Sequence, residues 1–183
     1  NEGLIDGPDR VPFNFSYGKN TKKFEVGHNG YVKTTGLTHV RRLELSLDGN
    51  FLEGEDLLIA LEDDDKKCFA KMLGFGNVSG IPYKVRFHLH PDVSIALDMG
   101  GVAASLTLKN GEIWVFRNIS DAELSVEQST FFDEGHLKPR NSNQIVLSYR
   151  TKVSASRTRW SLTKALPKAK FSQKNFDSPP QIM

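Results

Sequence analysis

The segment THVRRLELSLDGNFLEGEDLLIAL, residues 38–61, decides the fold class. It contains two apolar runs, residues 38–47 and 51–61, on either side of Asp48-Gly49-Asn50. Glycine tolerates a positive φ, and Asp and Asn are frequent neighbours of glycine in tight turns. We therefore predict that the two runs form an antiparallel β-hairpin.

Similar runs recur along most of the chain, whereas no long stretch has the 3.6-residue period of a helix. A second hairpin is predicted where Asn110-Gly111 separates two further runs. The spacing of the runs predicts an all-β fold, an antiparallel β-sandwich of two packed sheets with roughly ten or more strands and little helix. The candidate strands are residues 24–32, 38–47, 51–61, 83–90, 93–97, 102–108, 112–116, 122–130, 144–149 and 158–162.

The remaining segments predict the boundaries and connections of the domain. Residues 1–166 are predicted to form one domain, led by a polar segment at 1–11, and residues 167–183 to form a polar C-terminal tail. The charge run at residues 63–67 is interpreted as a solvated loop, and the glycine-rich residues 74–80 as a flexible connection. The chain begins with Asn1 rather than Met, so we expect it to be cut from a longer protein.

Composition excludes several functional classes. The 183 residues include 24 Lys+Arg and 22 Asp+Glu, a formal net charge of +2, which argues against a strongly basic nucleic-acid-binding protein. No apolar run approaches the length of a membrane span. Cys68 is the single cysteine, so neither an intrachain disulfide nor a cysteine-rich metal site is expected.

The segment KVRFHLHP, residues 84–91, is the sharpest candidate for a ligand site. Side chains alternate along a strand, so Val85, Phe87 and Leu89 should face the core while Arg86, His88 and His90 share the other face. Two imidazoles in this arrangement lie about 7 Å apart along the backbone, within reach of one metal ion or one anionic group. A structural or surface role for the same residues remains open.

His39 and Arg41 present a different pattern, because they share a strand face with Leu43 and Leu45. Burying an unpaired imidazole or guanidinium is costly, so this pair needs a partner: a carboxylate, a backbone carbonyl or a metal. His28 lies beside a turn and is expected to be exposed. The aromatic residues Trp114, Phe116 and Trp160 are interpreted as core positions, with sugar stacking as the alternative for one of them.

Several of these runs, taken in order, resemble a known family. They are GLIDGP (3–8), HNGY (28–31), HVRRL (39–43), RFHLHP (86–91), WVFR (114–117) and KPRNSNQIVL (138–147). Together they are similar to the C-terminal half of heparinase II/III-like proteins, in the α-proteobacterial subgroup, and the resemblance covers roughly residues 1–163.

The resemblance implies a polysaccharide lyase that pairs an N-terminal α/α toroid with a C-terminal β-sandwich and cleaves uronate-containing polysaccharides by β-elimination. It places the main catalytic residues in the toroid and in an early sandwich segment, neither of which is in this chain. The catalytic residues therefore stay unknown, and the chain alone is expected to be inactive. It also implies a structural zinc within the sandwich, for which only His39 matches a ligand position. We therefore expect no metal on this chain alone.

The resemblance leads to further expectations about partners. Arg86, His88 and His90 are the candidate substrate-binding residues, with an acidic polysaccharide and the toroid as partners and the cell envelope or periplasm as the location. Two other roles stay open, a non-catalytic carbohydrate-binding module and a scaffold. Exposed core faces and strand edges would make self-association plausible.

Overall fold

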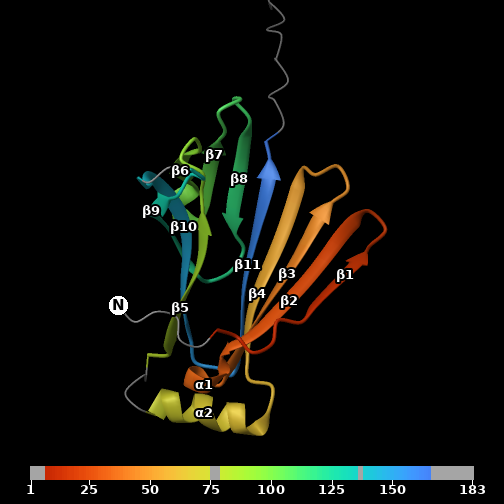
Figure 1. Ribbon diagram of the computed structural model, residues 1–183, viewed down its shortest axis with the longest axis vertical. Helices are drawn as coiled ribbons and strands as arrows, with labels where there is room; N and C mark the ends of the chain where they lie inside the picture. Colours follow the sequence, from red (N-terminus) through yellow and green to blue (C-terminus); the bar gives the residue numbers. More distant parts are fainter. Residues whose placement is uncertain (1–6, 75–78, 136–137, 166–183) are drawn as a thin grey trace, which may run out of the picture.

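The structure, a computed structural model, describes residues 7–74, 79–135 and 138–165. It is an antiparallel β-sandwich of an eight-stranded and a three-stranded sheet, which confirms the predicted fold class (Figure 1). The strands are β1 (Phe13–Tyr17), β2 (Thr21–Tyr31), β3 (Leu37–Ser46), β4 (Phe51–Ile59), β5 (Ile81–His88), β6 (Ser94–Asp98), β7 (Ala103–Thr107), β8 (Ile113–Asn118), β9 (Glu123–Phe131), β10 (Arg140–Thr151) and β11 (Ala155–Lys164). The helices are α1 (Val32–Thr35), α2 (Asp63–Gly74) and the short 3₁₀ helix η1 (Met99–Gly101).

The two sheets have the strand orders β1-β2-β3-β4-β11-β8-β7-β6 and β5-β10-β9. Both predicted hairpins are present, as β3 with β4 and β7 with β8. In the first turn Gly49 has φ +71°, and the Asp48 carboxylate accepts the backbone N–H of Asn50. The turn chemistry read from the sequence therefore sets the register of the hairpin that decides the fold.

The main core lies between the two sheets. It includes Phe116, Leu124, Ile145 and Leu147, and Trp160 extends it toward β4. Gly54 is paired with Trp160 across β4 and β11, and a Cβ at Gly54 would lie only 2.1 Å from Cζ2 of the indole. The glycine is therefore required for the indole to lie flat over β4. Phe116 and Trp160 are core residues, as predicted, and Phe116 stacks on the indole at 5.7 Å between ring centroids.

The interpretation of residues 63–67 as a loop is wrong, because they begin helix α2. Three acidic residues in the first turn favour a helix N-terminus, and the Asp65 side chain accepts the backbone N–H of Glu62 as in a capping box. Asp63–Lys66 and Asp64–Lys67 pairs add support on the exposed side.

Helix α2 owes its position to its apolar face. Phe69 is 3% exposed and packs with Leu37, Leu58 and Ile81 in a second small core. Met72 and Leu73, three and four residues on, contact the same cluster. The helix therefore connects β4 of the large sheet to β5 of the small one and packs against both (Figure 1).

The sequence did not predict β1, whose five residues pair with β2 at the edge of the large sheet. Residues 7–11, the described part of the leading segment, lie outside helices and strands. Most of the predicted connection at 74–80 and the whole predicted tail at 167–183 lie outside the described residues. In the part of the chain that the structure covers, none of the helices is both long and apolar enough to span a membrane.

Candidate functional site

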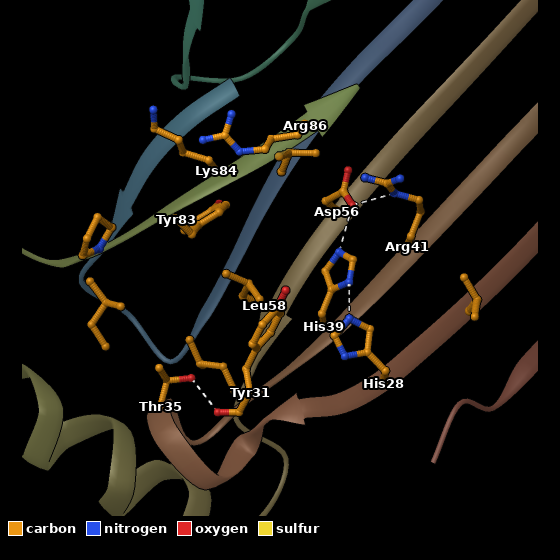
Figure 2. A pocket seen from close by; sticks show the side chains of 15 residues that line it. His28, Tyr31, Thr35, His39, Arg41, Asp56, Leu58, Tyr83, Lys84 and Arg86 are labelled. Carbon is orange, nitrogen blue, oxygen red and sulfur yellow. Dashed lines mark hydrogen bonds and ion pairs between the residues drawn. The ribbon is translucent and has the colours of Figure 1, made fainter. Parts of the chain in front are cut away.

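The cleft between the sheets is the candidate site. It has a volume of about 570 Å³ and lies between β2, β3 and β4 of the large sheet and β5 of the small one (Figure 2). This volume is within the range of small-molecule and cofactor sites. Its polar lining includes His28, Tyr31, His39, Arg41, Asp56 and Tyr83.

A directed series of hydrogen bonds runs along the large-sheet wall of the cleft (Figure 2). The backbone N–H of Gly30 donates to His28 Nδ1 at 3.3 Å, so His28 carries its proton on Nε2. His28 Nε2 lies 3.2 Å from His39 Nδ1, and His39 Nε2 lies 2.9 Å from Asp56 Oδ1. Since a carboxylate accepts, the proton of His39 is on Nε2 and its Nδ1 accepts from His28. Each imidazole therefore has a defined tautomer.

Asp56 ends this series as a buried carboxylate. It is 2% exposed and also accepts from Arg41 Nε at 2.8 Å and Trp160 Nε1 at 3.0 Å. Burial alone would raise the pKa of Asp56, but the bonds from His39, Arg41 and Trp160 outweigh it and hold the pKa below its ordinary value. Asp56 is therefore the partner that the sequence required for His39 and Arg41, and it is a carboxylate.

His28 corrects one expectation. It lies within β2, half-buried, and pairs with His39 across the sheet instead of lying exposed beside a turn. Burial, and then the positive charge of a protonated His39, lowers the pKa of His28. The Tyr31 ring meets its imidazole edge-on at 5.1 Å.

The opposite wall is formed by β5. Tyr83 hydrogen-bonds Thr158 Oγ1 at 2.7 Å, and burial raises the pKa of the Tyr83 hydroxyl. Lys84 and Arg86 border the cleft and each reaches Glu127 at 2.7 Å. The Arg41 guanidinium lies over the Phe87 ring at 5.5 Å, which brings the two walls into contact.

The predicted substrate-binding residues occupy the face that alternation assigned to them. Arg86, His88 and His90 are exposed, while Val85 is buried and Phe87 packs on the core. Arg86 alone of the three lines the cleft; His88 Nδ1 lies 2.7 Å from Ser129 Oγ on the outer face of the small sheet. A substrate role for the three residues stays a prediction.

The described residues do not by themselves form the zinc site that the resemblance implies, and a ligand role for His39 stays a prediction. Both ring nitrogens of His39 are engaged, by His28 and by Asp56. Across the described ranges, no group of three or more His, Cys, Asp or Glu side chains is arranged to hold a metal ion, whereas a zinc site needs three or four protein ligands.

The sequence missed His28 and Asp56 as members of the site. A signal for Asp56 was present, because Gly54, Asp56 and Leu58 occupy alternate positions of one strand, and an acidic residue on an apolar face needs a donor. His28 had no comparable local signal, since only the β2–β3 register brings it to His39.

Comparison with known proteins gives both a family and a fold. Residues 8–161 match the family described as Heparinase II/III-like, C-terminal. FtsZ-localized protein C of Caulobacter vibrioides is 31% identical over 163 residues, covering 88% of this chain and 27% of that protein.

Two solved structures share the fold. Heparan sulfate lyase HepC of Pedobacter heparinus superposes with a TM-score of 0.63 at 11% identity, over 85% of this chain and 22% of that one. A heparinase III structure gives 0.57 at 11% identity, over 84% and 21%. The chain thus spans about a quarter of the length of these relatives or less.

Proposed function

Because the chain belongs to the heparinase II/III-like C-terminal family, we propose that it is the β-sandwich part of a longer polysaccharide lyase and that its cleft binds a uronate-containing polysaccharide. The longer protein cleaves this polymer by β-elimination. The 183-residue chain contributes binding and is inactive alone. The observation that carries the proposal is the cleft itself, with the imidazoles and Arg41 on one wall, Tyr83 on the other, and Lys84 and Arg86 at its border.

Arg41 is the residue best placed to bind a substrate carboxylate. Asp56 engages it through Nε, which orients the guanidinium and leaves its terminal NH₂ groups to form a fork with a second carboxylate. In β-elimination a uronate carboxylate must be neutralised before the neighbouring proton becomes acidic enough to remove. A fixed guanidinium fulfils that requirement.

The remaining residues of the cleft suit a sugar ring. His28, Tyr31 and Tyr83 line the cleft with their rings. The ring nitrogens of His28 and the Tyr83 hydroxyl already have protein partners, so these two rings offer contact surface rather than free donors. Such a mixture of apolar rings and a few fixed polar groups is typical of ligand sites.

Two measurements test the proposal. The full-length protein should release unsaturated uronate products from an acidic polysaccharide, detected by ultraviolet absorbance, and the 183-residue chain should not. The chain should migrate more slowly in gels that contain the polysaccharide. Absence of both signals on a panel of uronate polymers would refute the proposal.

The chain offers a matched pair of variants for the binding measurement. Arg41→Gln removes the guanidinium that faces the cleft, whereas Arg42→Gln removes one on the opposite face, paired with Glu25 and Glu55. A hydrogen bond to a charged group contributes about 1.5–3 kcal/mol, so Arg41→Gln should weaken binding by roughly 10- to 100-fold and Arg42→Gln by little. Denaturation midpoints of both variants identify any loss that comes from unfolding.

A scaffold role is the second candidate, and the identity to FtsZ-localized protein C favours it. In that case the full-length protein should sediment with polymers of FtsZ and show no lyase activity. Sedimentation unchanged by Arg41→Gln would separate this role from saccharide binding.

A further inference from the structure

The inner face of the small sheet is apolar in its middle and polar at one end. Directly paired residues of antiparallel strands share a face, and Leu147 and its partners on β5 and β9 are buried in the main core. Toward the start of β10 the same face carries two further cross-strand pairs, Asn143 with Gln128 and Asn141 with Thr130. The inner face therefore changes at this end from aliphatic side chains to amides and a hydroxyl.

A hollow of about 290 Å³ lies at this polar end of the sheet, near the lower limit for small-molecule sites. We call it the polar hollow. Besides the two pairs, its lining includes Pro91, Ser129 and Ser142. Among the described residues, none lines both the polar hollow and the cleft. Along β10, Asn141 is five residues, or about 17 Å, from Val146, the partner of Arg86. The polar hollow is therefore separate from the cleft.

The four paired side chains of the polar hollow have unused hydrogen-bonding capacity. Gln128, Thr130 and Asn141 are exposed, and Asn143 is half-buried. Over the ranges that the structure describes, none of the four donates to or accepts from another protein group through its side chain. Each amide offers one carbonyl acceptor and two N–H donors, and the threonine hydroxyl offers both functions. Adjacent groups of this kind can bind neighbouring hydroxyls of one ligand.

The polar hollow has no charge to offer a ligand. Of the described residues that line it, none has an ionisable side chain. Arg140, the residue before Asn141, is engaged by Asp92 at 2.9 Å and by Asp133 at 3.2 Å. A carboxylate placed in the hollow would lose hydration without gaining a cation. The hollow therefore favours a neutral ligand that is rich in hydroxyls.

An exposed aromatic ring follows the polar end of β9. Phe132 lies two residues beyond Thr130 and is 73% exposed. Alternation, continued from β9, assigns its ring to the same face as Thr130. One side of a pyranose ring carries C–H groups and its edge carries hydroxyls, so a sugar requires an apolar surface next to fixed polar groups. The ring and the amides together provide both.

We propose that the polar hollow is a second saccharide-binding site and that it binds a neutral sugar, with the amides of Asn141 and Asn143 on the hydroxyls and the ring of Phe132 stacked on the sugar face. The ligand is a hexose or an N-acetylhexosamine unit. This site goes beyond the function proposed for the cleft, because it requires neither a uronate nor lyase activity. The two sites differ in charge: Arg41 in the cleft selects an anion, whereas the polar hollow selects against one.

Amide NMR spectra of the 183-residue chain, recorded during titration with a β-1,4-linked tetramer of N-acetylglucosamine, test the site. This neutral probe should shift the amides of residues 128–132 and 140–143, with a dissociation constant in the millimolar range or below. A tetramer of galacturonate should shift these amides much less, because its carboxylates meet no cation in the polar hollow. No shift with the neutral probe, or an equal shift with the uronate probe, would refute the proposal.

Variants at exposed positions identify the residues that bind. Phe132→Ala should weaken binding of the neutral tetramer roughly 2- to 10-fold, and Asn141→Ala by a similar factor. Phe13→Ala, at a ring on β1 that is 74% exposed, is the matched control and should leave binding unchanged. Parental affinity in both Phe132→Ala and Asn141→Ala would contradict the assignment of these residues.

Two further measurements separate this site from the cleft and from a covered surface. Arg41→Gln should bind the neutral tetramer as the parent does, and loss of that binding would place the probe in the cleft instead. The full-length protein should also bind the tetramer, measured by calorimetry, with the same dependence on Phe132. Absence of binding there would show that another part of the polypeptide covers the polar hollow, which also overturns the proposal.

Discussion

Replacing Asp56 by Asn should destabilise the domain although the two side chains have nearly the same shape. The Asn amide would place a donor where Asp56 Oδ2 now accepts Trp160 Nε1–H at 3.0 Å. Leaving a buried N–H unpaired costs about 1–3 kcal/mol. Loss of the negative charge next to Arg41 adds about 1 kcal/mol, a small amount because the Arg41 side chain is 31% exposed and can be solvated again. The expected loss is therefore about 2–4 kcal/mol.

Urea denaturation of the 183-residue chain measures this loss directly, and thermal melting should show a fall of about 5–15 °C for a domain of this size. Asp121→Asn, at an exposed position, is the matched control and should change stability by less than ~0.5 kcal/mol. In the Asp56→Asn background, Trp160→Phe should cost less than in the parent, because the unpaired donor is removed with it. A loss below ~0.5 kcal/mol for Asp56→Asn would show that the carboxylate is not the partner on which the network depends.

Three further predictions concern the same region. The pKa of Asp56 is lower in the folded chain than in the unfolded one. The contribution of Asp56 to stability is therefore complete above the unfolded pKa, about 4, and is lost as pH falls through the folded pKa. The urea midpoint of Asp56→Asn should accordingly vary less with pH on the acid side than that of the parent. Gly54→Ala should cost about 1–3 kcal/mol in urea denaturation, because the new Cβ must displace the Trp160 ring; an unchanged midpoint would contradict the close approach of glycine and indole. Tyr83→Phe should cost about 1–2 kcal/mol by leaving the buried Thr158 hydroxyl without its 2.7 Å partner, and a neutral result in the same assay would show that this bond contributes nothing.

The strand pattern could be predicted because it is local. Alternation along residues 38–61 and the turn at Gly49 depend on neighbours in sequence, and both are present in the structure. Helix α2 was missed for the opposite reason. Its charged first turn has the composition of a loop as well as of a helix N-terminus, and the packing of Phe69 against both sheets, which local sequence does not show, decides for the helix.

The site was predicted in part. The need for a partner to His39 and Arg41 follows from one strand alone, since a polar pair on an apolar face has to be satisfied. The identity of that partner depends on which residue of β4 is in register with β3, and Asp56 is paired with Arg41 there. His28 depends on the register of a third strand. Such register information is not contained in any single run of sequence.

The close approach of Gly54 and Trp160 has a consequence for the history of the family. Because the indole of Trp160 occupies the volume that a side chain at position 54 would need, substitutions at positions 54 and 160 should depend on each other. Homologues with a larger residue at position 54 should carry a smaller one at position 160. They should also lack the carboxylate at position 56, which accepts the hydrogen bond of the indole N–H. The three sites should thus covary, so that an ancestral substitution at one of them was tolerated only together with compensating changes at the others.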